Sequence, residues 1–253
     1  MPESAELLRF YEDAYSSDPA HSVEYARWRA LGAVGKADHV IALCERAGVV
    51  PTSTLEVGCG DGALLSELRR RGFGGRLTGV EISDAAVAIV RQRPQIDAVA
   101  RYDGLHLPDG DEAHDLGILS HVLEHVPDPP ALLAEVARTC RAVLVEVPLE
   151  ANLSARRAGK REHAAEVGHL HRLDRRAARQ IVARAGLQIA CELEDPLPLT
   201  VQRFFATGAR GRAQATVKWA TRASLHRLAP QLARRLFTVH YACMCVAPAT
   251  RAS

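Results

Sequence analysis

The chain has 253 residues, enough for one large α/β domain with additions. Its 47% hydrophobic and 25% charged residues are typical of a folded globular protein and exclude disorder as the main state. No uncharged apolar run reaches about 18 residues, so no transmembrane helix is expected. The first residues do not form a basic and then apolar leader, and the six cysteines lack CxxC spacing. We therefore expect a reduced, cytoplasmic protein without a metal site.

Charge is divided unevenly along the chain. The formal net charge is +2, but residues 1–150 carry 14 Lys and Arg against 24 Asp and Glu, whereas residues 151–253 carry 18 against 6. Such a division indicates two surfaces with different partners. The alternative is that arginine-rich usage reflects the base composition of the gene and that solvated helix faces carry these charges.

The first half of the chain changes from helical to alternating elements. Apolar spacing predicts helices over 5–15 and 23–47, joined by a turn at 16–19. After residue 50, short apolar strands alternate with helices, which predicts parallel pairing in a doubly wound sheet. The expected strands are 54–57, 77–81, 98–102, 115–119 and 142–147, and the expected helices are 63–71, 84–93 and 130–140.

The second half begins with a long polar connection at 148–173, and links of that length are usually functional. A helix at 175–185, a strand at 187–193, a basic helical segment at 209–236 and a strand at 237–246 follow. The predicted fold is α/β: a doubly wound (Rossmann-like), seven-stranded, mostly parallel sheet with an N-terminal helical lid and a C-terminal helical insertion before the last strand. The predicted units are a lid at 1–49 and a main domain at 50–253, with a substrate loop at 148–173 and the insertion at 205–236.

A glycine-rich turn follows the first expected strand. Gly58, Gly60 and Gly62 stand at alternate positions, and a helix follows at once. Glycine allows a sharp turn and lets a ligand approach main-chain N–H groups at a helix N-terminus. This arrangement suits a nucleotide-like ligand at the end of the strand, although a tight strand–helix connection alone would also use it.

Two rival ligand motifs do not fit this turn. The spacing is G-x-G-x-G, whereas dinucleotide-binding turns prefer G-x-G-x-x-G, and no lysine has a tyrosine four residues earlier. A phosphate-binding loop needs Gly-Lys followed by Ser or Thr, but Lys36 and Lys160 are followed by Ala37 and Arg161.

Two further markers lie at the ends of later strands. Glu81 ends the second strand, where its carboxylate can accept hydrogen bonds from vicinal ribose hydroxyls. Asp103 ends the third strand, where it can accept a hydrogen bond from an exocyclic amine. Glu81 could instead cap the next helix, but its position after an apolar strand favours the ligand role.

Together these residues resemble the class I S-adenosylmethionine-dependent methyltransferases, in the small-molecule branch. The resemblance rests on the glycine turn with Glu56, on Glu81, on Asp103 with Leu107-Pro108, and on the run Leu123-Glu124-His125-Val126-Pro127-Asp128. Gly168-His169-Leu170-His171 is also similar to that branch. The similar region spans roughly residues 50–195.

The resemblance implies a cofactor site for S-adenosylmethionine, with S-adenosylhomocysteine as product and no metal. The glycines would admit the methionine portion, with Glu56 beneath them orienting its ammonium group. Glu81 would hold the ribose, and Asp103 with Gly104 would face the adenine. The residues assigned to the cofactor are Glu56, Gly58, Cys59, Gly60, Gly62, Glu81, Ile82, Asp103, Gly104, Ser120 and His121.

The substrate side is expected in the N-terminal helices and in the connection after the fifth strand. The basic residues of that connection suggest an anionic acceptor, because arginine pairs with carboxylates. For any single one of them a solvated loop residue is the simpler interpretation. The residues assigned to the substrate are Tyr11, Tyr15, Tyr25, Trp28, Arg29, Arg156, Arg161, His169 and His171.

The expected reaction is methylation of a small anionic metabolite on oxygen, with a carboxylate as the first choice of acceptor. A carboxylate needs only positioning, whereas a hydroxyl needs a base, for which His121 and His169 are the catalytic candidates. The alternatives are a hydroxyl or amine acceptor on an aromatic, sugar or amino-acid-derived product, and a partner protein that binds the cofactor without turnover.

The basic segment at 209–236 does not by itself identify a binding partner. Its apolar residues at helical spacing could dock on a membrane surface or RNA, but packing on its own sheet or on a second subunit is the commoner use. Trp219 and Phe237 are too few aromatics to indicate base stacking. We expect a homodimer and no nucleic acid.

Overall fold

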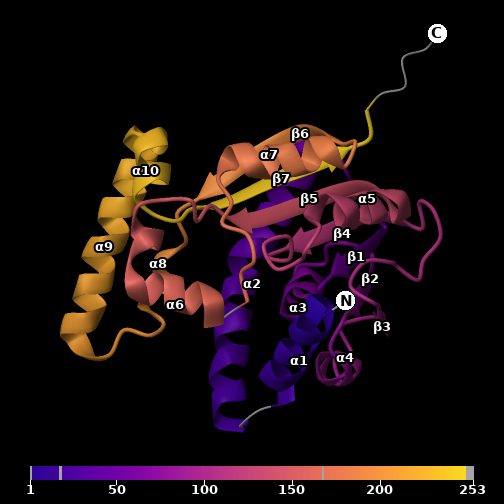
Figure 1. Ribbon diagram of the computed structural model, residues 1–253, viewed down its shortest axis with the longest axis horizontal. Coiled ribbons are helices and arrows are strands. Elements are labelled where there is room, and N and C mark those ends of the chain that lie inside the picture. The colour runs from indigo at the N-terminus through magenta and orange to yellow at the C-terminus, as the bar shows by residue number, and fades with distance from the viewer. Residues whose placement is uncertain (1, 17–18, 167, 249–253) are drawn as a thin grey trace.

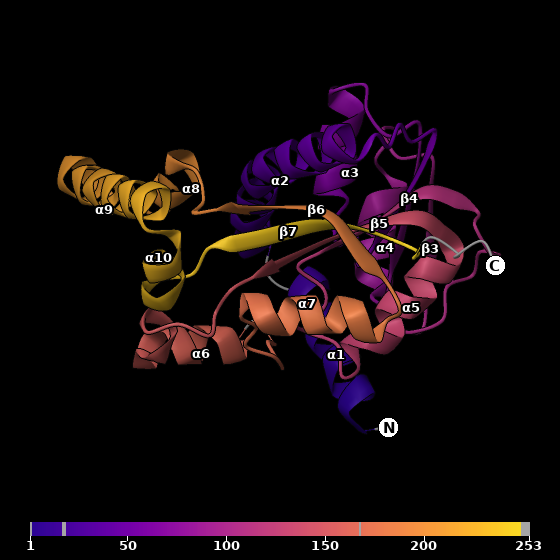
Figure 2. The ribbon, with the colours of Figure 1, turned by 90° about the horizontal axis from the view of Figure 1, so that it is seen from above.

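The computed structural model describes residues 2–16, 19–166 and 168–248. One twisted sheet, with helices on both faces, forms the centre of the molecule (Figures 1 and 2). Its strand order is β3-β2-β1-β4-β5-β7-β6. The strands are β1 (Ser53–Val57), β2 (Arg76–Glu81), β3 (Ala98–Arg101), β4 (His114–Ser120), β5 (Cys140–Pro148), β6 (Gln188–Asp195) and β7 (His240–Val246).

Strand pairing follows the predicted doubly wound pattern. The pairs among β1 to β5 are parallel, and β7 runs antiparallel between β5 and β6. The strand order reverses beside β1 and β4, and in such sheets a crevice for ligands opens at the carboxyl ends of the strands there. The expected fold class, a mostly parallel seven-stranded sheet, is confirmed.

Two apolar layers fix the helices against the sheet. Leu43, Leu65 and Val90, from α2, α3 and α4, share one cluster with the sheet, and Leu133 and Val182, from α5 and α7, share the other. The helices are α1 (Pro2–Ser16), α2 (Pro19–Ala47), α3 (Ala63–Arg70), α4 (Asp84–Arg91), α5 (Pro129–Thr139), α6 (Ala158–Glu166), α7 (Arg175–Arg184), α8 (Leu199–Arg203), α9 (Gly208–Leu228) and α10 (Pro230–Leu236).

Polar side chains fix where several helices begin. Ser83, Asp128 and Asp174 cap α4, α5 and α7 by accepting from the backbone N–H three residues later. Pro230 begins α10, as proline commonly does at a first helical position. These caps place the helix N-termini beside the carboxyl ends of the strands, where the candidate site lies.

The polar connection after β5 is more structured than its sequence indicates. It contains a short 3-10 turn, η1 (Ser154–Arg156), and the helix α6. It then docks on the loop after β4, because the N–H groups of Leu170 and His171 both donate to the carbonyl of Glu124, at 2.8 and 3.0 Å. The weak amphipathic pattern of α6 explains why the apolar periodicity did not reveal this helix.

Candidate functional site

The glycine turn between β1 and α3 brings main-chain N–H groups to the ligand crevice. Gly58, Gly60 and Gly62 have φ angles of 69°, 54° and 74°, which disfavour other residues. A side chain at Gly58 would also collide with Val122, whose Cγ2 lies 2.8 Å from the position of an added Cβ. Shape and backbone conformation therefore both require glycine here, which fits a close ligand approach.

Glu56 lies under this turn and is 5% exposed. Burial raises the pKa of its carboxyl group to about 8, with Lys36 acting in the opposite direction. Its Oε2 has no hydrogen-bond partner among the residues that the structure describes. A buried, unpartnered carboxylate oxygen is costly unless a ligand completes it, and a cationic ammonium group would do so.

Glu81 connects the tip of β2 to the turn. Its Oε2 accepts from the N–H of Gly60 at 2.9 Å, and its Oε1 accepts from the N–H of Ile82 at 2.7 Å. Burial raises the pKa of Glu81, although these hydrogen bonds act against the rise. The neighbouring Cys59 is buried, which raises the pKa of its thiol and gives it a packing role.

Asp103 lies at the exposed rim after β3. Its Oδ1 accepts from the N–H groups of Leu105 and His106 at 2.8 and 2.7 Å. The His106 side chain bonds Oδ2 and holds the pKa of Asp103 at about 2. Gly104 follows with a φ of 94°, so this segment presents an ionised carboxylate and a sharply turned backbone beside Ile82.

The helix α1 covers the crevice. The Tyr15 hydroxyl lies 2.5 Å from the position that a Cβ on Gly60 would take, and the Arg29 guanidinium lies over the Tyr15 ring, 5.1 Å from its centroid. Arg29 also pairs with Asp61 at 3.2 Å. The lid predicted from the sequence therefore reaches the glycine turn through Tyr15 and Arg29.

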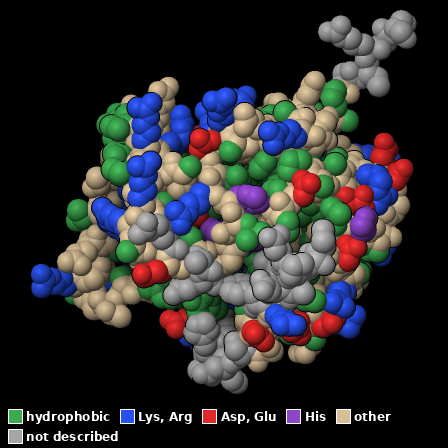
Figure 3. Space-filling view, in the orientation of Figure 1, with side chains coloured by type: hydrophobic (Ala, Val, Ile, Leu, Met, Phe, Trp, Pro, Cys, Tyr) green, Lys and Arg blue, Asp and Glu red, His purple; other side chains and the backbone are tan. Residues whose placement is uncertain are grey.

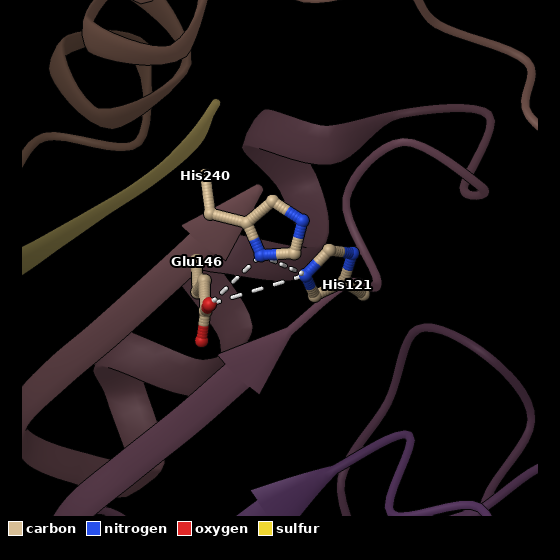
Figure 4. A group of neighbouring side chains, drawn as sticks. All are labelled: His121, Glu146 and His240. Carbon is tan, nitrogen blue, oxygen red and sulfur yellow. Dashed lines mark hydrogen bonds and ion pairs between the residues drawn. The ribbon is translucent and has the colours of Figure 1, made fainter. Parts of the chain in front are cut away.

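A histidine cluster surrounds Glu146, which is fully buried on β5. Its Oε1 lies 3.5 Å from His240 Nδ1 and 3.9 Å from His121 Nε2 (Figure 4). The same Oε1 lies 3.1 Å from His39 Nδ1, and Oε2 accepts from the Ser120 hydroxyl at 3.1 Å. Burial would raise the pKa of Glu146, but His240 and His39 hold it well below its usual range. Burial lowers the pKa of His121 to about 4, so this imidazole is neutral at pH 7.

A second histidine pair lies between the loop after β4 and the connection after β5. His169 Nδ1 donates to Glu150 Oε2 at 2.7 Å, and His125 Nδ1 donates to the carbonyl of Gly168 at 3.1 Å. The two rings meet edge to face with centroids 4.7 Å apart, and Tyr11 meets the His125 ring at 5.8 Å. Burial opposes protonation of His169, but Glu150 raises its pKa overall.

Two of the other residues assigned to the substrate, Trp28 and His171, have contacts within the protein. Trp28 packs on Phe204 and Phe205, with centroids 5.3 and 5.1 Å away. His171 donates to the carbonyl of Val126 at 2.8 Å, a contact that holds the loop. Arg156 is exposed on η1, Tyr25 is half-buried on α2, and the side chain of Arg161 lies outside the described residues. Their substrate roles stay predictions.

Sequence reasoning did not select several residues that complete the site. Glu146 and His240 lie within expected strands, where apolar neighbours concealed them, and Glu150 follows in the connection. His39 occupies an expected helix, where a single histidine carries no signal of its own. The only available signal was a charged residue inside a buried strand, as Glu146 is in Val145-Glu146-Val147.

The fold and the glycine turn with Glu81 define an α/β protein of the class I methyltransferase type. A family described as a methyltransferase domain matches residues 25–192, more than half of the chain. The chain therefore belongs to the methyltransferase domain family, which confirms the resemblance seen in the sequence.

Curated relatives match part of the chain. A ubiquinone biosynthesis O-methyltransferase of Hahella chejuensis is 28% identical over 109 residues, which are 38% of this chain and 42% of that protein. The protein of the same name from Pseudomonas paraeruginosa is 31% identical over 106 residues, 40% of this chain and 43% of that protein. The chain thus matches about two fifths of the length of these relatives.

Solved structures share the fold over most of this chain. Geranyl diphosphate C-methyltransferase of Streptomyces coelicolor A3(2), crystallised with Mg²⁺, geranyl diphosphate and S-adenosyl-L-homocysteine, has a TM-score of 0.67 at 17% identity, covering 98% of this chain and 99% of that one. Phosphoethanolamine N-methyltransferase 2 of Haemonchus contortus, with S-adenosyl-L-methionine, has a TM-score of 0.57 at 14% identity, covering 82% and 52%. At these identities the likeness establishes the fold.

Proposed function

We propose that this protein is an S-adenosylmethionine-dependent methyltransferase that methylates an oxygen atom of a small anionic metabolite. Support for the cofactor comes from the unpartnered Oε2 of Glu56, which suits an ammonium group, and from the glycine turn, where a Cβ at Gly58 or Gly60 would collide with Val122 or Tyr15. Glu81 and Asp103 would receive the ribose and the adenine. When bound, the cofactor supplies an electrophilic methyl group on a cationic sulfur.

The observation that carries the choice of oxygen is the pair formed by His169 and Glu150. Because Nδ1 of His169 donates to Glu150, its neutral form keeps a lone pair on Nε2 for a proton. This arrangement of an acceptor imidazole oriented by a carboxylate is the one used to deprotonate hydroxyl groups. His169 takes the hydroxyl proton while the acceptor oxygen forms its bond to the methyl carbon and the carbon–sulfur bond breaks.

Support for an anionic substrate comes from α6 and α9. Repulsion among Arg157, Lys160, Lys218 and Arg222 adds to burial in lowering the pKa of Lys218, and Arg157 together with burial lowers that of Arg222. A bound anion relieves such repulsion between like charges. Figure 3 shows Lys and Arg side chains gathered over this side of the molecule. A carboxylate acceptor, which needs no base, is the second candidate, favoured by these cations alone.

The test uses S-adenosylmethionine labelled on its methyl group, the purified protein and a metabolite extract of the cells that produce it. Base-stable label in the small-molecule fraction supports a hydroxyl or an amine acceptor, and base-labile label released as methanol identifies a methyl ester instead. Label in macromolecules contradicts the small-molecule proposal. Cofactor binding without transfer would favour a partner protein that binds the cofactor without turnover.

Variants then test the base. His169→Gln lowers turnover by about 10²- to 10⁴-fold while cofactor affinity stays unchanged, because the lost group acts only on the acceptor proton. His226→Ala on α9, whose ring pairs with Glu194 at 3.4 Å, is the matched control and keeps full turnover. Equal turnover in the His169→Gln variant and the wild type would exclude His169 as the general base.

The Glu150→Gln variant adds a test through the pH dependence of turnover. Glu150 raises the pKa of His169, so its loss moves the acid limb of the pH–rate profile to lower pH. An acid limb that stays in place would show that another group titrates.

No described helix is long and apolar enough to cross a membrane. The homodimer and the cytoplasmic location stay predictions.

A further inference from the structure

Three side chains from separate strands converge at the carboxyl end of the sheet. His121 follows β4, Glu146 lies on β5 and His240 begins β7 (Figure 4). The distance between His121 Nε2 and His240 Nδ1 is 3.3 Å, and these nitrogens lie 3.9 and 3.5 Å from Glu146 Oε1. One carboxylate oxygen and two imidazole nitrogens thus form a triangle of nearly equal edges.

The sheet register produces this convergence. Glu146 pairs with Ala242 across the antiparallel β5–β7 ladder, and His240 stands two residues from Ala242, so Glu146 and His240 share one face. The N–H of His121 donates to the carbonyl of Glu146 at 2.9 Å, which places it at the same level. His121 also has a φ of 60°, an uncommon conformation for a residue other than glycine and one found at functional sites.

We propose that His121, Glu146 and His240 bind a divalent transition metal ion of the Zn²⁺ class. A tetrahedral ion with bonds of about 2.0–2.1 Å has ligand–ligand edges of about 3.4 Å, close to the observed triangle. Two imidazoles and one carboxylate with a fourth, open position are a donor set of catalytic zinc sites. The side chains of His121 and His240 are 22% and 14% exposed, so both rings contact solvent.

Outer contacts orient each ligand in the way that metal sites require. His121 turns Nδ1 toward Glu124 Oε1 at 3.2 Å, which leaves Nε2 for the ion. His39 and Ser120 hold Glu146 from α2 and β4, each at 3.1 Å. A carboxylate behind a ligating histidine and hydrogen bonds to a ligating carboxylate are the usual outer shell of such sites.

The same side chains could instead form a network of ion pairs. Such a network places a proton between the facing nitrogens His121 Nε2 and His240 Nδ1, which lie 3.3 Å apart, and another between His39 and Glu146. A metal cation bound between the two facing nitrogens forms one coordinate bond with each of them. The open fourth position then takes water or an oxygen of an anionic small molecule.

The test titrates the chelator-treated full chain with Co²⁺ and Zn²⁺ in the absence of cofactor and acceptor. We expect one equivalent of Co²⁺ with the visible absorption of a four- or five-coordinate ion, displaced by Zn²⁺. His240→Ala and His121→Ala weaken binding by more than about 100-fold, and Glu124→Gln weakens it by about 10- to 100-fold as an outer contact. His226→Ala, a histidine outside the triangle, binds as the wild type does.

Two results would overturn the site: no stoichiometric metal in the wild type, or affinity in the His240→Ala and His121→Ala variants equal to that of the wild type. Circular dichroism checks the fold of each variant, and the two histidines lie on different elements, so either variant keeps the test decisive if the other fails to fold. Because the titration uses neither cofactor nor acceptor, its outcome is independent of the proposed methyl transfer.

Discussion

Glu56 combines a cost in stability with a role in binding. Its carboxyl group is buried beneath the glycine turn, and Oε2 has no hydrogen-bond partner among the described residues. Replacing this oxygen with an amide removes the charge that would face the cofactor ammonium group, a contact worth about 2 kcal/mol. We therefore expect Glu56→Gln to raise the Kd for S-adenosylmethionine by about 30-fold.

Isothermal titration calorimetry measures this change directly. The matched control is Glu45→Gln, the same substitution at an exposed position on α2, which should leave the Kd unchanged. S-adenosylhomocysteine carries the same ammonium group and should lose affinity to the same extent. Unchanged affinity of the Glu56→Gln variant for both ligands would remove Glu56 from the cofactor site.

The site residues that were predicted have a signal in the neighbouring sequence, whereas the site residues that were missed do not. Gly58 and Glu81 stand at strand ends beside turns, and a strand followed by glycine is visible in any short window. Glu146 and His240 meet only because β7 inserts antiparallel beside β5, a pairing between segments almost a hundred residues apart. Short-range periodicity carries no information on such pairing.

At the scale of elements, the Glu12 side chain links α1 to the N-terminus of α4. Glu12 accepts from the Ser83 hydroxyl at 2.8 Å and from the N–H of Ala85 at 3.2 Å, so it adds a second cap to the N-terminus of α4. The hydrogen bond from the Ser83 hydroxyl makes the largest contribution to lowering the pKa of the Glu12 carboxyl group, so Glu12 is ionised at pH 7. These hydrogen bonds of Glu12 hold α1 in place, with Tyr15 over the glycine turn, where the cofactor must enter.

We expect Glu12→Ala to speed cofactor release. A lost cap costs about 1 kcal/mol, which corresponds to about a fivefold rise in the dissociation rate constant if α1 must open for release. Stopped-flow displacement of bound cofactor measures this rate. Asp13→Ala, at the next position on the exposed side of α1, is the control and keeps the wild-type rate. A rate unaffected by Glu12→Ala would mean that release bypasses α1.

Most elements were predictable because their signals agree. The alternation of apolar strands with capped helices indicated all seven strands and the helices α3, α4, α5 and α7 close to their observed bounds. The exceptions are the short helix α8, which was not predicted, and α6, whose surface is polar nearly all round and so gives no apolar periodicity. The position of α1 against the domain could not be predicted from the sequence either, because the hydrogen bond between Ser83 and Glu12 joins segments about seventy residues apart.

At the scale of the whole molecule, the sheet separates two tasks. Its β1–β2–β3 half carries the glycine turn, Glu81 and Asp103, whereas its β4–β5–β7 half carries both histidine clusters. The two halves meet at β1 and β4, where the strand order reverses, so a cofactor held by one half faces the polar groups of the other. The helices α6, α9 and α10 extend the second half outward (Figure 2), and α9 and α10 carry basic but no acidic side chains.

Buried Glu56 also gives the stability of the empty protein a definite pH dependence. Its pKa is about 8 in the folded chain and near 4.5 when unfolded, so between these values the folded state binds the extra proton. Raising the pH through this window therefore lowers the free energy of unfolding, by at most about 1.4 kcal/mol per pH unit. Carboxyl groups with lowered pKa values, such as Glu67 at about 2, act below pH 4.5 and do not interfere.

The contribution of Glu56 is isolated by comparing the wild type with Glu56→Gln, which cannot ionise. Urea unfolding at pH 5 and pH 8 should give a difference between the two proteins that grows with pH in favour of the variant. Saturating cofactor narrows that difference at pH 8, because only the ionised wild-type carboxylate gains from the ammonium group. A difference that is the same at both pH values would place Glu56 in a solvated environment and exclude the buried carboxyl group described above.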